Sequence, residues 1–275
     1  MNEIPVLDAA ALLKRHGLRA RKSLGQNFLQ DPVALEKIIS VAQIEPKDVV
    51  LEIGPGLGSL TRYLSISAKQ VVAVELDPEL IPPLKEILAP YQNVRVVHGD
   101  ILKLTPKDLI AEKDYLVAAN IPYYITSAVI RHLLENDSKP RRIVLTVQKE
   151  VAKRICAEPG DMSLLALSVQ VYGKPRIAAD IPADSFFPAT KVDSAVLSID
   201  IYSSPLIPSN LLETFFNLIR AGFSQKRKTL RNSLSSGLHI SPAEAENMLA
   251  RANINPQRRA ETLSIEEWRY LCEIR

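Results

Sequence analysis

Residues 52–58 read Glu-Ile-Gly-Pro-Gly-Leu-Gly, and this stretch decides the expected fold because it joins a buried strand to a helix. The run that leads into it, 48–53 (DVVLEI), is rich in β-branched and other apolar residues, as in a strand covered on both faces. The segment that follows, 57–67, has helical spacing. Three glycines in such a loop let a ligand approach the backbone and turn helix N–H groups toward it. The pattern alone is also compatible with NAD, another nucleotide or a tight turn.

Short β-branched runs alternate with segments of helical spacing through the first half of the chain. The predicted strands are 48–53, 70–76, 94–98, 115–120 and 142–148, and the predicted helices are 57–67, 78–88, 125–135 and 149–156. This alternation predicts an α/β fold whose mostly parallel sheet is covered by helices on both faces. Two further extended runs are expected at about 165–173 and 192–201, the latter as an antiparallel last strand.

The pattern changes at about Pro205, after the turn-forming residues Ser203 and Ser204. Three later segments have helical spacing and follow capping residues: 211–221 after Ser209 and Asn210, 242–252 after Ser241, and 265–274 after Ser264. The sequence therefore predicts two domains, an α/β domain at 1–204 and a small all-α domain at 205–275.

Composition and cysteine usage narrow the class of protein. The chain of 275 residues is 47% hydrophobic and 24% charged, which is typical of a globular protein with a core. Its two cysteines, Cys156 and Cys272, lack metal-ligand spacing, so we expect a reducing, cytoplasmic setting with no metal and no disulfide framework. We also expect no signal peptide and no membrane partner, because no apolar run approaches the length of a membrane span.

Two acids after the next predicted strands favour S-adenosylmethionine over NAD. Glu75 lies 21 residues after Gly54, and Asp100 follows the third strand. The carboxylate of Glu75 can accept both ribose hydroxyls, because an acid at this edge of the sheet faces the ligand crevice. Asp100 can accept the exocyclic amine of the cofactor's adenine, although a plain turn residue after Gly99 remains the alternative. A dinucleotide site needs the first acid but has no special use for the second.

The segment Asn120-Ile121-Pro122-Tyr123 follows the strand 115–120 and combines an amide, a proline and an aromatic ring. The side-chain oxygen of Asn120 can accept hydrogen bonds from the exocyclic amine of a nucleobase. Tyr123 offers a flat surface on which that base can stack. Taken alone, the segment can equally be a strand end that turns at the proline and buries the tyrosine in the core.

Basic residues gather in two places on a chain whose net charge is only +3. The ranges 14–22 and 220–231 each contain five Lys or Arg residues and no acid. Such local clusters indicate a polyanionic partner, and the alternative is a solvated basic face.

Four separated motifs resemble those of the ribosomal RNA adenine N6-dimethyltransferase family, in its bacterial small-subunit branch, and they occur in the family's order. The resemblance extends from Lys22 to about Trp268. Besides Asn120–Tyr123, the range 22–29 (KSLGQNFL) resembles the family motif that packs over the cofactor. The range 186–195 (FFPATKVDSA) resembles its second aromatic motif, with Thr190 where proline is usual. The basic range 223–234 (FSQKRKTLRNSL) resembles its C-terminal domain.

The resemblance implies a Rossmann-like class I S-adenosylmethionine-dependent methyltransferase domain at 1–204 and a helical RNA- and ribosome-binding domain at 205–275. It implies transfer of methyl groups from S-adenosylmethionine to N6 of two adjacent adenosines in the 3′-terminal hairpin loop of 16S rRNA in the 30S subunit. The products are N6,N6-dimethyladenosines, and a role in small-subunit biogenesis is expected. Two alternatives remain open: a large-subunit rRNA adenine methylase that confers macrolide resistance, and an assembly factor whose main role is binding.

Site residues carry over from the family's motifs and from the basic clusters. The expected cofactor contacts are Asn27, Leu29, Gly54, Gly56, Gly58, Glu75, Leu76, Asp100, Ile101 and Asn120. The expected target-adenine residues are Asn120, Ile121, Pro122, Tyr123 and, on the other side of the base, Phe186. The expected RNA contacts are Lys22, Lys226, Arg227, Lys228 and Arg231. No general base is expected, because Asn120 and a carbonyl of segment 121–122 hold the amine pyramidal and the methylated amine loses its proton to water.

Overall fold

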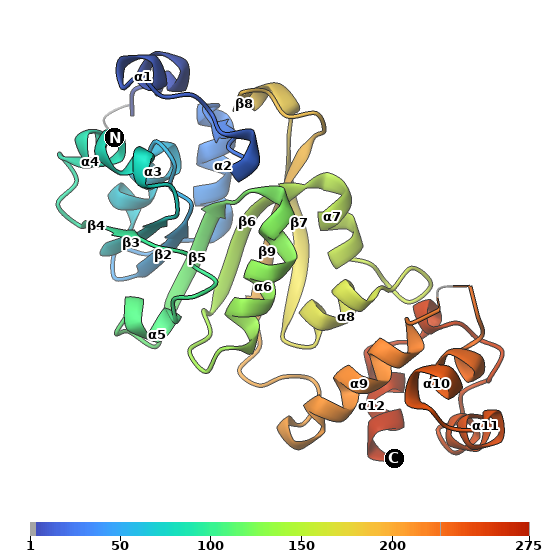
Figure 1. Cartoon of the computed structure of the whole chain (residues 1–275). Coiled ribbons are helices and arrows are strands. Elements are labelled where there is room, and N and C mark those ends of the chain that lie inside the picture. The colour runs from blue at the N-terminus through green and yellow to red at the C-terminus, as the bar shows by residue number, and fades with distance from the viewer. Residues whose placement is uncertain (1–3, 226, 275) are drawn as a thin grey trace. The chain divides into compact units, whose positions relative to one another are not determined.

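The computed structural model describes residues 4–225 and 227–274, and within them a seven-stranded sheet has the order β4-β3-β2-β5-β6-β9-β7 (Figure 1). Neighbouring strands from β4 to β6 pair in parallel, and β9 pairs antiparallel with β6. The strands are β2 (Val49–Ile53), β3 (Gln70–Glu75), β4 (Val94–His98), β5 (Tyr115–Asn120), β6 (Arg142–Gln148), β7 (Gly173–Ile181) and β9 (Ser194–Ile201). This is the mostly parallel sheet that the alternating pattern predicts, and β9, the last strand in the sequence, is antiparallel as expected.

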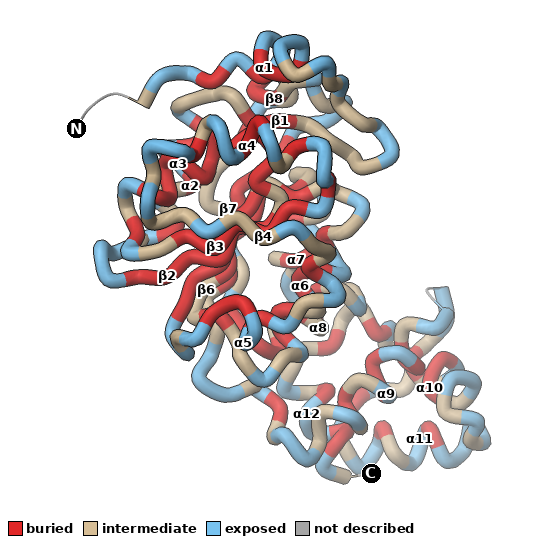
Figure 2. Tube along the Cα trace, turned by 60° about the vertical axis from the view of Figure 1, so that its left-hand side comes forward, coloured by how far each residue is buried: buried red, intermediate tan, exposed pale blue. Residues whose placement is uncertain are grey.

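Continuous apolar runs become the buried middle of this sheet. Every residue of β2 is buried, as are all of β5 except Asn120, and Figure 2 shows the central strands as buried. The edge strand β4 is only half-buried, since it has one neighbour in the sheet. A second, two-stranded sheet pairs β1 (Phe28–Leu29) antiparallel with β8 (Phe186–Phe187), so that Leu29 faces Phe186 across the register.

The four segments predicted as helices between residues 57 and 156 all form helices, whereas the helices at 9–15, 32–42 and 106–109 were not predicted. The helix between β5 and β6, α6, lies in front of the sheet in Figure 1. The connecting and N-terminal helices are α1 (Ala9–Arg15), α2 (Pro32–Ala42), α3 (Ser59–Ser67), α4 (Ile81–Leu88), α5 (Pro106–Leu109), α6 (Thr126–Glu135) and α7 (Lys149–Ile155).

The chain divides into two compact units, one formed by Met1–Ala152 and Arg176–Ile201, the other by Lys153–Pro175 and Tyr202–Arg275. The last change of unit, between Ile201 and Tyr202, falls close to the boundary expected at residue 205. The segment Lys153–Pro175 groups with the C-terminal helices, although it precedes that boundary. The helices of the second unit are α8 (Leu164–Gln170), α9 (Leu212–Gly222), α10 (Leu230–Leu238), α11 (Pro242–Arg251) and α12 (Ile265–Glu273).

The extended run predicted at 165–173 is wrong, because Leu164–Gln170 forms helix α8 and the strand β7 begins only at Gly173. A short apolar run does not distinguish a buried strand from a buried helix by periodicity. Here the side chain of Ser163 accepts a hydrogen bond from the N–H of Ala166 at 3.1 Å and starts the helix. The basic range after α9 also contains a helix, α10, which the sequence analysis did not predict.

The capping residues predicted at the starts of the C-terminal helices act as caps at two helices out of three. Ser241 forms a capping box with Glu244 at the start of α11, and Ser264 forms one with Glu267 at the start of α12. Before α9, by contrast, residues Ser209–Leu211 form a short 3₁₀ turn, and no side chain caps the helix.

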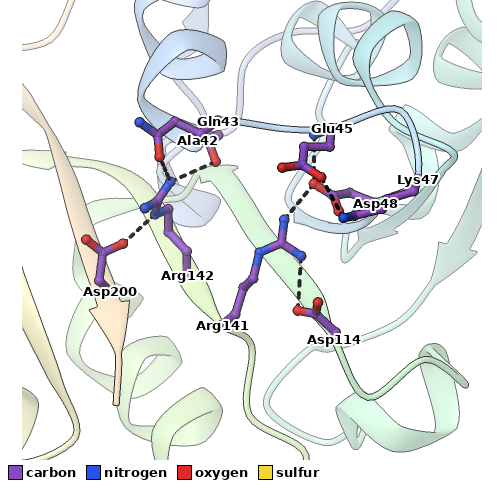
Figure 3. Close-up of polar contacts among 9 residues, drawn as sticks. All are labelled: Ala42, Gln43, Glu45, Lys47, Asp48, Asp114, Arg141, Arg142 and Asp200. Carbon is purple, nitrogen blue, oxygen red and sulfur yellow. Dashed lines mark hydrogen bonds and ion pairs between the residues drawn. The ribbon is translucent and has the colours of Figure 1, made fainter. Parts of the chain in front are cut away.

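Ion pairs tie the amino ends of the parallel strands together (Figure 3). Arg141, just before β6, donates to Asp48 at 2.6 Å and to Asp114 at 3.0 Å, which precede β2 and β5. Arg142 pairs with Asp200 of β9 and donates to the side chain of Gln43 at the end of α2 at 2.6 Å. Because the strands are parallel, their carboxyl ends all meet at the other edge, where the residues predicted for the site lie.

Candidate active site

The carboxyl ends of the parallel strands open on a cavity of about 290 Å³ in the first unit. Six parts of the sequence form its wall: 24–29, the loop and helix start after β2, the end of β3, the residues after β4, segment 120–125, and Phe186. All the predicted cofactor and target-adenine residues line this cavity except Gly58. Residues that are spread over most of the first unit's sequence thus meet in one place.

The three glycines of the loop have positive φ angles of +67°, +58° and +86° at Gly54, Gly56 and Gly58. A Cβ on Gly54 would meet no atom closer than the backbone oxygen of Asn120 at 3.9 Å, so the cavity approaches the bare backbone there. At Gly56 the ring of Phe28 lies 3.0 Å from the Cβ position. At Gly58 the nearest atom is a methyl group of Leu84 in α4, at 3.2 Å. Gly58 therefore permits close packing against α4 and is not among the residues that line the cavity, so its expected cofactor contact stays a prediction.

Glu75 ends β3 with its carboxylate buried and held by two backbone N–H groups. Its Oε1 accepts from Asp77 at 2.8 Å and its Oε2 accepts from Gly56 at 3.0 Å. Burial raises the pKa of this carboxyl, while the two backbone hydrogen bonds oppose the shift. Each carboxylate oxygen keeps a lone pair for a further donor, so the group is oriented toward the cavity and able to accept a diol.

Asp100 and its neighbours form the next part of the wall. The Oδ1 of Asp100 accepts a hydrogen bond from the N–H of Leu102 at 3.0 Å. This bond closes a turn, as the alternative interpretation of Asp100 as a turn residue requires. The half-buried carboxylate nevertheless lines the cavity, so a turn role and a ligand role are compatible. Leu76 leaves 46% of its surface exposed, whereas Ile101 is buried, and both line the same cavity with apolar atoms.

The amide of Asn120 has a defined orientation. Its Nδ2 donates to the backbone oxygen of Asn27 at 3.1 Å, and the side chain of Asn27 donates in turn to the oxygen of Gly25. Because the nitrogen is used in this way, Oδ1 is the atom of the amide that remains as an acceptor. The predicted role of Asn120 as an acceptor for an amine therefore agrees with its geometry.

Tyr123 is half-buried and lines the cavity, so it is not core filler. Its hydroxyl shares a hydrogen bond of 2.6 Å with the hydroxyl of the buried residue Ser194 at the start of β9. This contact anchors one end of the ring. Tyr124, the next residue, leaves 62% of its surface exposed and also lines the cavity.

Phe186 differs from the open stacking surface that the motif suggests. It lines the cavity, but only 4% of its surface is exposed, and it packs in a core cluster with Leu29 and Ile181. Phe186 therefore forms a wall of the cavity with little free area. In the same motif, the N–H of Thr190 donates to the oxygen of Ala183 at 3.1 Å, a bond that proline cannot make.

Two acids of the site were not recognised from sequence. Glu52 lines the cavity with 1% of its surface exposed, and its Oε2 has no hydrogen-bond partner among the described residues. Burial raises the pKa of Glu52 to about 8. Asp77, two residues beyond Glu75, is buried and ion-paired to Arg21. An acid within a predicted buried strand, such as Glu52, was the available signal.

The predicted RNA contacts have different surroundings. Lys22, Arg227 and Lys228 are exposed, and Lys226 lies outside the described residues. Arg231 is half-buried and pairs with Glu246 at 3.3 Å, so its charge is already partnered within the second unit. The structure thus distinguishes three exposed cations from one half-buried arginine that already has an acidic partner.

Two kinds of feature are absent from the described residues. No group of three or more His, Cys, Asp or Glu side chains within them is arranged to hold a metal ion. Nor does any helix in the described part of the chain have the length and apolar character needed to cross a membrane.

The strand order, the antiparallel strand beside β6 and the acids after β3 and β4 define a Rossmann-like methyltransferase. Within that class, the model of the family described as "Ribosomal RNA adenine dimethylase" matches residues 17–274, and the chain belongs to this family. The resemblance drawn from the motifs is therefore confirmed.

Individual relatives cover nearly the whole chain. The chain is 47% identical over 265 residues to the Ribosomal RNA small subunit methyltransferase A of Dehalococcoides mccartyi, covering 96% of this chain and 91% of that one. A dimethyladenosine transferase from Plasmodium falciparum superposes with a TM-score of 0.76 at 28% identity, covering 89% and 95% of the two chains. The 23S rRNA methyltransferase ErmE superposes with a TM-score of 0.72 at 29% identity, covering 90% and 99%.

Proposed function

We propose that the protein transfers methyl groups from S-adenosylmethionine to N6 of two adjacent adenosines in the 3′-terminal hairpin loop of 16S rRNA in the 30S subunit. The observation that carries the proposal is the meeting of Glu75, Asp100 and Asn120 at one cavity. The proposal is also supported by similarity over nearly the full length to small-subunit rRNA methyltransferases, two of which are 47% and 42% identical to the chain. Reaction on a ribosomal subunit implies that the protein works in the cytoplasm.

The residues of the cavity fit the proposed cofactor by their chemistry. Glu75 offers carboxylate oxygens for the ribose hydroxyls and Asp100 offers one for the adenine amine, while Leu76 and Ile101 offer apolar contact to the ring. Gly54 leaves bare backbone at the wall, where a Cβ would meet no atom closer than 3.9 Å. When bound, S-adenosylmethionine supplies the electrophilic methyl group and the leaving sulfonium.

Asn120 and Tyr123 act on the other substrate, the target adenine. The lone pair of its N6 is delocalised into the purine ring, which makes the amine a poor nucleophile. Hydrogen bonds from N6 to Oδ1 of Asn120 and to a carbonyl of segment 121–122 favour a pyramidal nitrogen and direct the lone pair at the methyl group. Stacking on Tyr123 holds the base, with the buried ring of Phe186 as a wall. The protein thus contributes position and orientation, and the proton leaves to water.

The cavity accepts one base, so the target must be unpaired or swung out of its loop. Contacts between exposed cations and RNA phosphates would bring the target base to the cavity. Lys22, Arg227 and Lys228 are exposed, and Lys226 is proposed as a further phosphate contact. The helical residues 205–275 are proposed as the RNA- and ribosome-binding domain. The pairing of Arg231 with Glu246 makes it the weakest candidate of the set.

Mapping the methylated nucleotides tests the proposal directly. The protein is incubated with labelled S-adenosylmethionine and either unmodified 30S subunits or protein-free large-subunit RNA, and modified positions are located by primer extension. Two adjacent dimethyladenosines near the 3′ end of 16S rRNA are expected. Label on an adenine of the large-subunit RNA instead would favour the macrolide-resistance activity, which the similarity to ErmE makes the second candidate.

The variant Asn120→Ala separates catalysis from binding. We expect it to abolish methylation, because the only side-chain acceptor proposed for the amine is removed. If it also leaves subunit maturation normal in cells lacking the wild-type protein, the binding role of an assembly factor is the main one.

A further inference from the structure

We infer that Asp77 is a positioning residue that fastens segment 21–27 to the cavity acid Glu75 and so sets the geometry of both substrate sites. Asp77 does not itself line the cavity. The inference deepens the proposed function and rests on it for the identity of the ligands. The contacts that carry it belong entirely to the first unit.

The carboxylate of Asp77 accepts hydrogen bonds from both ends of the loop 21–26. Only 3% of Asp77 is exposed, its Oδ1 accepts from Nη1 of Arg21 at 2.9 Å, and its Oδ2 accepts from Nε2 of Gln26 at 2.7 Å. The loop is closed internally as well, since the N–H of Arg21 donates to Oε1 of Gln26 at 2.8 Å. Arg21 also reaches Glu79, at 2.5 Å. Charge-assisted bonds of this kind are strong and directional, so the carboxylate defines where the loop lies.

The same residue orients the acid at the end of β3. The N–H of Asp77 donates to Oε1 of Glu75 at 2.8 Å, while Gly56 of the glycine loop donates to Oε2 at 3.0 Å. Glu75 is the residue proposed to accept the ribose hydroxyls. Asp77 therefore connects the N-terminal segment to the cofactor side of the cavity through two successive hydrogen bonds.

Segment 21–27 in turn reaches the target-adenine side. Gly25, with φ of +61°, has its Cβ position 3.1 Å from atoms of both Pro122 and Tyr124. The backbone oxygen of Asn27 holds the amide of Asn120 at 3.1 Å. A displacement of this segment would release the nitrogen of that amide and leave its oxygen without a defined direction. The contacts of Asp77 thus extend to the acceptor of the target amine.

The competing explanation is that Asp77 only stabilises the fold, and the chain offers a matched control for it. Asp48 is equally buried at 3% and is also paired with an arginine, Arg141, at 2.6 Å. It lies at the amino ends of the strands, at the edge of the sheet opposite to the cavity (Figure 3). Replacing either aspartate by asparagine removes one buried charge from one arginine, but only Asp77 contacts the site.

The test compares the full-length variants Asp77→Asn and Asp48→Asn by titration calorimetry with S-adenosylmethionine and by hydrogen exchange of segment 21–27. We expect Asp77→Asn to weaken the affinity about tenfold or more, because an amide nitrogen then faces the donors of Arg21 or Gln26. Amide exchange of the segment should accelerate in the same variant. Asp48→Asn should leave both readouts unchanged at temperatures where it is folded.

A second variant keeps the test decisive if Asp77→Asn does not fold. Arg21→Met removes the loop's charged donor without touching Glu75, and the same two changes are expected from it. Wild-type values in both Asp77→Asn and Arg21→Met, or equal losses in Asp48→Asn, would overturn the inference. Absence of S-adenosylmethionine binding by the wild-type protein would instead overturn the proposed function, and the exchange comparison would still decide the role of Asp77.

Discussion

Replacing Tyr123 by alanine and by phenylalanine separates the two contributions of this side chain to catalysis. The ring is proposed to stack on the target base, and stacking of this kind contributes about 1–3 kcal/mol per base. Its loss in Tyr123→Ala should lower kcat/KM by roughly 5- to 150-fold. The hydroxyl makes one hydrogen bond of 2.6 Å to the buried Ser194. Losing that bond in Tyr123→Phe should cost only about 1 kcal/mol, which is less than a tenfold effect.

The assay is the initial rate of methyl transfer to unmodified 30S subunits at varied subunit concentration. Ser194→Ala is the matched control, because it removes the same hydrogen bond and leaves the ring intact. It should resemble Tyr123→Phe, and the double variant should be no worse than either single variant. Equal losses in Tyr123→Ala and Tyr123→Phe would refute stacking as the main role of the residue.

Three further predictions concern buried charge and RNA affinity. Burial holds the pKa of Glu52 at about 8 against 4.5 for an ordinary Glu, so folding takes up a proton between those values. Wild-type stability should therefore fall as pH rises from 5 to 8.5 relative to Glu52→Gln, by at most about 5 kcal/mol in chemical denaturation. Arg141→Met removes the charged partner of the buried Asp48, which keeps the hydrogen bond from the N–H of Glu45, and should lower the free energy of unfolding by about 2 kcal/mol. Neutralising three cations together should make the salt dependence of 30S binding shallower, by about 2 to 3 in log–log slope; they are Lys22, Lys226 and Lys228.

Lys47 provides a common control for the last two predictions. It is exposed, forms a salt bridge with the exposed Glu45, and lies just before β2 at the amino end of that strand. Lys47→Met should change stability by less than about 0.5 kcal/mol and leave the salt slope unchanged. A stability difference for Glu52→Gln that does not vary with pH, a neutral Arg141→Met, or an unchanged salt slope in the triple variant would each contradict the corresponding reasoning.

Local sequence was sufficient where one signal acted over a few residues. The strand before the glycine loop, the loop itself and the helix after it follow from apolar runs and from glycine's access to positive φ. Ser241 and Ser264 were predicted as helix caps from such local signals, and in the structure each forms a capping box within four residues. The segment 164–170 was misassigned because its apolar residues suit a buried strand and a buried helix equally, and packing in the second unit decides between them.

The residue types at the carboxyl ends of the strands were also readable, because parallel strands bring those ends to one edge whatever the connections between them. The precise roles at that edge depend on contacts between distant residues. Asn120 is oriented by Asn27, which is 93 residues away, and Asp77 holds Gln26 across 51 residues. Gly58 packs on α4 and Phe186 is enclosed by the core, although their motifs alone predict contact with ligands. Sequence patterning therefore determines which groups line the cavity. Tertiary packing determines which of their atoms remain free to bind a ligand, because the other atoms are buried or hydrogen-bonded to distant segments.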